Sequence, residues 1–189
     1  MAPITGVVIT LDEADNIEAC LASLARVCDE LIVVDSGSRD ATRELAERAG
    51  ARVIAQPYLG DGPQKNVGPA QANHRWVLSL DADERLTDEA VQAIRGLDLA
   101  TTTRAGFALR RRNFIGSRWV KTCGWYPDYC IRLYDRERTG FSDSRQHASV
   151  TTRDVTRLEA DIEHYSFANL SELFTKASGR FSTRAAKIM

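Results

Sequence analysis

The sequence has almost no excess of charge of either sign. It carries 25 Lys and Arg residues against 26 Asp and Glu residues, which leaves a net charge of -1 over 189 residues. Domains that bind nucleic acid through its phosphates usually carry a basic surplus, so the composition gives no reason to expect nucleic acid as a partner. Any attraction for a charged ligand must come from a local cluster of side chains.

Long apolar runs are also missing. No window reaches the roughly 18 apolar residues that a membrane-spanning helix requires, and the first residues do not form a basic region followed by an apolar stretch. We therefore expect a cytoplasmic protein.

Cysteine is scarce and is not arranged in CxxC pairs. We expect free thiols, because a chain without an export signal meets a reducing compartment. The alternative is a zinc site, which lacks paired ligand spacing and would have to combine Cys123, Cys130, His147 and His164.

Two phosphate-binding motifs are absent. No GxGxxG follows the first apolar run, and no GxxxxGK[ST] occurs anywhere. Both the dinucleotide-binding and the P-loop interpretations therefore lose their specific support.

What the first half does contain is a regular alternation of short apolar runs and amphipathic segments. The amphipathic segments 12–27 and 36–50 are predicted helices, and the loop QPYLGDGPQKN leads into a shorter one. The predicted strands are 6–11, 30–35, 51–55 and 76–80. This alternation predicts an α/β fold in which a mostly parallel, Rossmann-like central sheet is covered by helices on both faces.

The pattern changes after Leu97. Strand-like segments dominate at 105–114, 128–136, 147–154 and 157–167, and one helix follows from about residue 169. No linker separates the halves, so we predict a single domain over 1–189. It comprises an α/β half (4–97), a mixed half (98–168) and an amphipathic terminal helix (169–189).

Acidic side chains follow three of the predicted strands. Glu13 follows the first, Asp35 ends the second, and Asp81 and Asp83 follow the fourth. The carboxyl ends of parallel strands meet at one rim, where ligands collect. Asp81 and Asp83 point to the same side if strand geometry persists, so a cation between them would relieve their repulsion. Mg²⁺ or Mn²⁺ bound to a diphosphate meets this need.

Several segments together resemble one known family. VVITLDEADNIEACLASL, ELIVVDSGSRDAT, GPQKN, WVLSLDADERL and GWYPDYCIRLY, in this order, are similar to family 2 glycosyltransferases of the GT-A fold. The group with the greatest likeness includes bacterial lipopolysaccharide inner-core β-1,4-glucosyltransferases. The resemblance covers nearly the whole chain and implies an inverting, metal-dependent transfer from a UDP-sugar. It also implies that 4–97 is the nucleotide-sugar-binding half and 98–168 the acceptor-side half.

The resemblance also implies roles for the rim residues. Asp35 matches an aspartate that hydrogen-bonds uracil, and Asp83 is the preferred metal ligand, with Asp81 as a second ligand shared with the ribose. Lys65 would neutralise diphosphate charge; the alternative is a solvated lysine at a helix start. The first loop, which lines the nucleotide pocket, contributes Thr10, Leu11 and Glu13.

An inverting transfer also needs a base for the acceptor hydroxyl. Asp128 matches the family's acidic position before Arg132, so it is the predicted general base; the alternative is a turn residue after Pro127. The chain departs from the pattern at Cys130, where relatives have Gln, and at Ala148, where relatives have Glu. His147 either orients a ligand or is structural.

Two basic segments have competing interpretations. Strand alternation places Arg110 and Arg112 on one face and Arg111 on the other, so the run is either a solvated strand edge or a site for an acidic acceptor. The terminal helix either packs against the domain or lies on an anionic inner-membrane surface, which would make the protein peripheral there.

Three functions are compared. We predict an enzyme that moves a sugar, with glucose as the expected sugar, from a UDP-sugar to a glycan or lipid-linked glycan of the cell envelope such as lipopolysaccharide core. The alternative is a non-catalytic module that binds nucleotide-sugars or glycans. A phosphate-receiver domain is disfavoured because the second half is too long and mixed.

Overall fold

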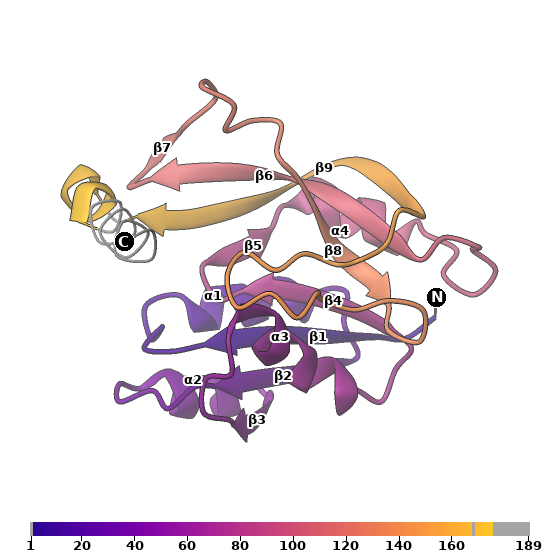
Figure 1. The fold of residues 1–189 in the computed structure, drawn as a ribbon, viewed down its shortest axis with the longest axis horizontal. Helices are drawn as coiled ribbons and strands as arrows, with labels where there is room; N and C mark the ends of the chain where they lie inside the picture. The colour runs from indigo at the N-terminus through magenta and orange to yellow at the C-terminus, as the bar shows by residue number, and fades with distance from the viewer. Residues whose placement is uncertain (1, 168, 176–189) are drawn as a thin grey trace, which may run out of the picture.

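The chain folds around one mixed sheet (Figure 1). The computed structural model describes residues 2–167 and 169–175. Strand order is β3-β2-β1-β4-β8-β6-β9-β5, with β7 paired to β6. The strands are β1 (Ile4–Thr10), β2 (Glu30–Asp35), β3 (Arg52–Ala55), β4 (Trp76–Asp81), β5 (Glu84–Leu86), β6 (Gly106–Ile115), β7 (Arg118–Trp119), β8 (Tyr129–Asp135) and β9 (Val155–Phe167).

The first four strands are parallel, and their helices lie on both faces. The helices are α1 (Ile17–Leu24), α2 (Thr42–Arg48), α3 (Asp61–Ala70) and α4 (Asp88–Arg95). Val8 and Leu78 belong to the core cluster shared with α1, α2 and α4, whereas their neighbours Val7 and Val77 belong to the cluster beneath α3. This alternation is what a strand buried on both sides requires, and it confirms the predicted α/β arrangement.

The second half adds antiparallel pairing. β8 pairs antiparallel with β4 and with β6, whereas β9 pairs parallel with β6 and antiparallel with the short β5. In Figure 1, β6 and β9 run side by side and extend beyond the parallel region. This pairing brings residues of the C-terminal half next to the acidic turn after β4.

The predicted strand at 147–154 is wrong. Only Val150 makes a bridge there, to Phe141, and the backbone of His147 has φ = 54°. A left-handed residue interrupts an extended strand. The start of the segment instead lies against the start of α3, where the Ala148 N–H donates to Oδ2 of Asp61 at 2.6 Å.

The predicted loop QPYLGDGPQKN is also partly wrong, because α3 begins inside it at Asp61. The first helical turn tolerates Pro63, which lacks a backbone donor, and an aspartate at this end complements the helix dipole. Lys65 therefore lies one turn after Asp61 on the same helix face.

Two glycines allow α3 to approach its surroundings closely. A Cβ at Gly68 would lie 2.4 Å from Cγ1 of Val7 in β1, and a Cβ at Gly62 would lie 1.7 Å from the carbonyl oxygen of Ser142. Neither space can hold a methyl group without movement of the chain. The close contact fixes the height of α3 above the sheet.

We expect Gly62→Ala to lower the free energy of unfolding by about 1–3 kcal/mol, because the added methyl overlaps the backbone of Ser142. Urea unfolding measures the change. Gly96→Ala is the matched control, because a Cβ there meets nothing closer than 3.5 Å and the φ of Gly96 is -78°. Equal midpoints for Gly62→Ala and the parent would contradict the expectation.

The predicted terminal helix is described only at its beginning. Residues 170–175 are helical, and the side chains of Leu170 and Phe174 are 59% and 70% exposed. The remainder of that prediction, 176–189, lies outside the described residues. Within 2–167 and 169–175, no helix combines the length and the apolar character needed to cross a membrane.

Candidate active site

A cleft of about 420 Å³ lies at the carboxyl ends of β1, β2 and β4. This is the rim at which the parallel strands deliver their loops. Most of the predicted site residues line it. The lining residues are Ile9, Thr10, Leu11, Glu13, Ser36, Tyr58, Asp61, Lys65, Asp81, Ala82, Asp83 and His164.

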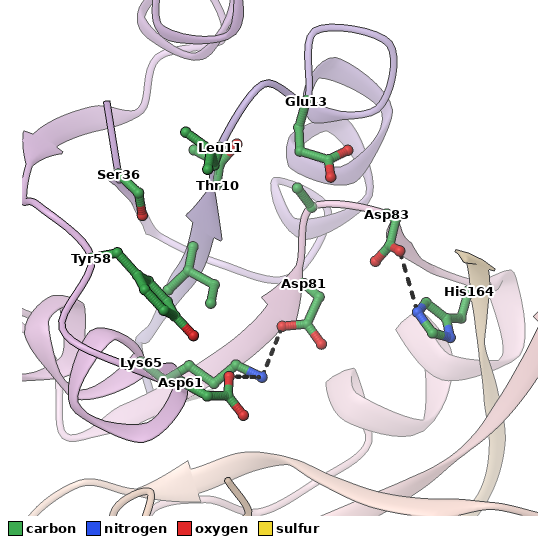
Figure 2. Close-up of a pocket in the computed structure, with 12 residues that line it drawn as sticks. Thr10, Leu11, Glu13, Ser36, Tyr58, Asp61, Lys65, Asp81, Asp83 and His164 are labelled. Atoms are coloured by element: carbon green, nitrogen blue, oxygen red, sulfur yellow. Dashed lines mark ion pairs between the residues drawn. The ribbon is translucent and has the colours of Figure 1, made fainter. Parts of the chain in front are cut away.

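Figure 2 shows how these side chains divide the cleft. Ser36 and Tyr58 lie at one side, and Asp83 with His164 lies at the opposite side. Asp81 and Lys65 lie between them and form an ion pair. The cleft therefore has a largely uncharged end and a charged end.

Two positively charged side chains contact the carboxylate of Asp81. Its Oδ1 lies 3.0 Å from Nζ of Lys65, and its Oδ2 accepts a hydrogen bond from Nη2 of Arg132 at 3.0 Å. Burial of the carboxylate acts to raise its pKa, but Arg132 and Lys65 outweigh that effect, so the pKa of Asp81 lies well below its usual value. Asp81 is ionised and oriented before any ligand arrives.

Asp83 faces a histidine that comes from a distant part of the chain. Oδ2 of Asp83 lies 3.3 Å from Nε2 of His164 in β9. The backbone fixes this approach, because the Tyr165 N–H donates to the carbonyl of Asp83 at 2.9 Å. Nδ1 of His164 contacts Oδ1 of Asn113 at 2.7 Å, which orients the ring.

Lys65 is shared between two carboxylates of the cleft. Besides Asp81, its ammonium lies 3.3 Å from Oδ1 of Asp61, one turn earlier on α3. The other oxygen of Asp61 accepts the Ala148 N–H at 2.6 Å, so the 142–150 segment helps to hold it. The alternative of a solvated lysine is wrong, because Lys65 is buried.

The first loop contributes one buried hydroxyl without a partner. Thr10 lines the cleft, and its buried Oγ1 makes no hydrogen bond within the described structure. A buried polar atom without a partner is costly unless a ligand or water satisfies it. Leu11 is 52% exposed at the rim, and the carboxylate of Glu13 accepts a hydrogen bond from Asn16 at 2.8 Å.

Asp35 is buried beside the cleft but is not among its lining residues. Its Oδ1 accepts the backbone N–H groups of Gly37 and Ser38, both at 3.1 Å. The carboxylate therefore shapes the loop that carries the cleft residue Ser36. Its predicted contact with a nucleobase stays a prediction.

Asp128 also lies outside the cleft lining. Nε and Nη2 of Arg111 donate to its Oδ2 at 3.0 and 2.7 Å. Its side chain is 34% exposed, so solvent reaches part of the group. Arg111 leads back toward the cleft, because its Nη1 lies 3.8 Å from Oε1 of buried Glu84.

The arginine run divides as strand alternation predicted. Arg110 and Arg112 both contact Asp161, whereas Arg111 contacts Asp128 on the other face. Each of the three is engaged by a carboxylate of the chain. The run gives no separate support for a site that binds an acidic acceptor.

Comparison with known proteins decides the family. The family model described as "Glycosyl transferase family 2" matches residues 5–159, which is most of the chain. The chain belongs to glycosyltransferase family 2. The resemblance expected from the sequence motifs is thereby confirmed, and so is the prediction of an enzyme.

Curated relatives of this glycosyltransferase are found among bacteria. An uncharacterized glycosyltransferase of Rickettsia felis is 29% identical over the whole chain, which spans 71% of that protein. Another, of Rickettsia bellii, is 30% identical over 93% of the chain, which spans 64% of that protein. The lipopolysaccharide core biosynthesis glycosyltransferase LpsC of Rhizobium meliloti is 32% identical over 60% of the chain and 43% of its own length.

Solved structures share the fold of this glycosyltransferase. TarS of S. aureus, residues 1–349, superposes with a TM-score of 0.62 at 17% identity, over 87% of the chain and 60% of that protein. TarS has also been solved in complex with UDP-GlcNAc. The likeness confirms the predicted GT-A type of fold.

The side chains of the glycosyltransferase's cleft fit a divalent cation in part. Cis ligands of an octahedral ion, each at about 2.1 Å, lie about 3 Å apart, close to the 3.3 Å between Asp83 and His164. In the part of the chain that the structure describes, no three His, Cys, Asp or Glu side chains form a complete metal site. Oxygen atoms of a substrate and water would have to complete the coordination.

The sequence patterns did not identify three ionisable cleft residues of the glycosyltransferase or the roles of two buried residues beside it. Tyr58 and Asp61 were assigned to a loop, and His164 was considered only for zinc. Glu84 and Arg132 carried no assigned role. A helical reading of 61–70 would have found Asp61, since it lies four residues before Lys65. No local signal pairs His164 with Asp83.

Proposed function

We propose that this chain is an inverting glycosyltransferase that moves a sugar from a UDP-sugar to a hydroxyl of a glycan acceptor with the help of Mg²⁺ or Mn²⁺. The observation that carries the proposal is the meeting of Asp81, Asp83, Lys65 and His164 in one cleft at the ends of β1 and β4. A cleft of about 420 Å³ is within the usual range for a small-molecule site.

The proposal assigns the uncharged end of the cleft to the nucleoside. Thr10, Leu11 and Tyr58 line the cleft, and the exposed side chains of Leu11 and Tyr58 offer apolar surface to a nucleoside. Asp81 would accept hydrogen bonds from ribose hydroxyls, because both of its oxygens are already oriented by cations. Asp35 would then support the base side of the pocket through the Ser36 loop.

The charged end is assigned to the diphosphate. Asp83 and His164 would hold the cation, which as a Lewis acid would stabilise the negative charge of the departing UDP. Lys65, whose Nζ lies 3.0 Å from Oδ1 of Asp81, supplies a second positive charge in the same cleft. This differs from the sequence-based prediction, in which Asp81 was also a metal ligand, because each of its oxygens contacts a cationic side chain.

In the transfer step, the acceptor oxygen bonds to the anomeric carbon as the bond from that carbon to the diphosphate oxygen breaks. The acceptor proton passes to a base, for which we propose Asp128. Arg111 binds only its Oδ2, which leaves Oδ1 to receive the proton. UDP carries away the bonding electron pair.

A glucose donor and a lipopolysaccharide core acceptor are the finer part of the proposal. They rest on the motif resemblance and on the similarity of 60% of this chain to LpsC, a lipopolysaccharide core biosynthesis glycosyltransferase. A peripheral contact with an anionic membrane belongs to the same part of the proposal. The exposed Leu170 and Phe174 offer apolar surface for it.

The test is release of UDP from a panel of UDP-sugars, with water or a core oligosaccharide as acceptor, in Mn²⁺ or in EDTA. We expect Mn²⁺-dependent turnover, with UDP-glucose as the best donor. Mn²⁺-dependent UDP affinity without turnover on any donor would favour the binding module. Equal turnover in EDTA would contradict the metal assignment.

A further inference from the structure

Seven ionisable side chains of alternating sign form a continuous ion-pair network from the cleft to the proposed base. They come from α3, the end of β4, β8, β5, β6 and the loop before β8. In spatial order they are Asp61, Lys65, Asp81, Arg132, Glu84, Arg111 and Asp128. The two ends of the proposed reaction are therefore joined by direct contacts.

Glu84 and Arg132 form the centre of this ion-pair network. Glu84 is fully buried, Arg132 is 5% exposed, and Nη2 of Arg132 donates to Oε1 of Glu84 at 2.5 Å. Oε2 of Glu84 accepts the backbone N–H of Asp81 at 3.1 Å. Glu84 thus holds Asp81 twice, directly at its backbone and through Arg132 at its carboxylate.

The ion-pair network continues from Glu84 to Arg111 and Asp128. Nη1 of Arg111 lies 3.8 Å from the same Oε1 that receives Arg132. Arg111 then donates twice to Oδ2 of Asp128. A single buried carboxylate oxygen therefore lies between the arginine that holds Asp81 and the arginine that holds Asp128.

Stability is a poor explanation for this arrangement. Removing two charges from water is costly, and well-packed apolar residues often replace a buried ion pair without loss. The pair is also imperfectly satisfied, because buried Nε of Arg132 has no hydrogen-bond partner within the described structure. What the pair does supply is a fixed orientation for two functional carboxylates.

We propose that Glu84 and Arg132 are positioning residues that orient Asp81 directly and Asp128 through Arg111. The inference rests on the proposed function and extends it. Neither residue touches the donor: both act by fixing the carboxylates that do the chemistry.

Glu84→Gln tests the centre of the ion-pair network. Glutamine keeps the size of the side chain and an acceptor for the Asp81 N–H, but it removes the charge that holds both arginines. We expect Mn²⁺-UDP affinity, measured by calorimetry, to fall about 10-fold, the lower end of the loss seen when a group that orients a metal-binding side chain is removed. We expect kcat to fall about 100-fold, the scale of a 1 Å misplacement.

Asp135→Asn is the matched control. Asp135 is fully buried, accepts from Arg75 at 2.5 Å, and lies on the same strand β8 as Arg132. It pairs with Trp76 at the opposite end of β4 from the cleft. We expect loss of stability in this control, with UDP affinity and kcat equal to those of the parent.

Two further variants separate positioning from folding. Glu84→Gln/Arg132→Met also removes the buried Arg132 charge that loses its Glu84 partner in Glu84→Gln, so it protects the fold, and we expect the same kinetic defects in it. Arg111→Lys keeps the charge but cannot donate from two nitrogen atoms in the same fork. We expect it to lower kcat without changing UDP affinity, and we expect its effect and that of Glu84→Gln not to multiply in the double variant.

The outcomes distinguish this inference from the proposed function. A parent protein that neither binds Mn²⁺-UDP nor releases UDP from any donor overturns the proposed function, and the inference with it. An active parent whose folded Glu84→Gln and Glu84→Gln/Arg132→Met variants match Asp135→Asn in affinity and kcat overturns the inference alone. Independent, multiplying effects of Glu84→Gln and Arg111→Lys overturn the link to Asp128.

Discussion

Replacing Asp128 with asparagine is expected to lower the turnover of sugar transfer by about 10²- to 10⁴-fold, the usual contribution of a general base. The asparagine side chain has nearly the same shape but cannot accept the acceptor's proton. Because Asp128 lies outside the cleft lining, the affinity for Mn²⁺-UDP should stay at the parent value. Steady-state UDP release and calorimetry measure the two quantities separately.

The chain offers a closely matched control for this variant. The side chain of Asp154 is 35% exposed, against 34% for Asp128, and it too is paired with arginine. Asp154→Asn should leave turnover unchanged. Parent-like turnover in Asp128→Asn would remove Asp128 from the mechanism, and another group would have to receive the proton.

Replacing Asp83 with alanine is expected to remove most of the metal-dependent affinity for UDP. Loss of a group that merely supports a metal ligand costs about 10- to 100-fold in affinity, so loss of a proposed direct ligand should cost at least about 100-fold. His164→Ala should act in the same direction, because its Nε2 lies 3.3 Å from Oδ2 of Asp83. Calorimetry of UDP in Mn²⁺ measures both.

The internal control is the same titration in EDTA. Without metal, the parent and Asp83→Ala should bind UDP with equal, weak affinity, because the difference between them depends on the cation. If Asp83→Ala binds UDP in Mn²⁺ as tightly as the parent, the cation is not held there. A difference that persists in EDTA would mean that Asp83 contacts the nucleotide directly.

Much of the donor side of the site follows from local sequence patterns. The apolar runs of β1 and β4 predict parallel strands, and the ends of parallel strands share one rim. Thr10, Leu11, Glu13, Lys65, Asp81 and Asp83 were predicted for one pocket, and all six line the same cleft. Their roles in binding and catalysis stay predictions.

The sequence patterns were less informative where local backbone details decide the outcome. Positive φ at His147 interrupts the predicted strand at 147–154, and α3 begins earlier than its Gly- and Pro-rich start suggested. The carboxylate of Asp35 accepts two backbone N–H groups of its own loop, and its predicted contact with a nucleobase stays a prediction. An aspartate at a strand end can do either, because both arrangements satisfy its charge.

The sequence by itself determined the family, the α/β architecture and the acidic turn after β4, because these depend on short-range periodicity and on motifs within single segments. Only the tertiary structure decided that His164 faces Asp83 and that Glu84 joins Arg132 to Arg111. Those contacts depend on the antiparallel register of β5 with β9 and on the packing of β6 and β8 behind it. Register between strands far apart in sequence is set by how the whole sheet closes, and no local pattern records it.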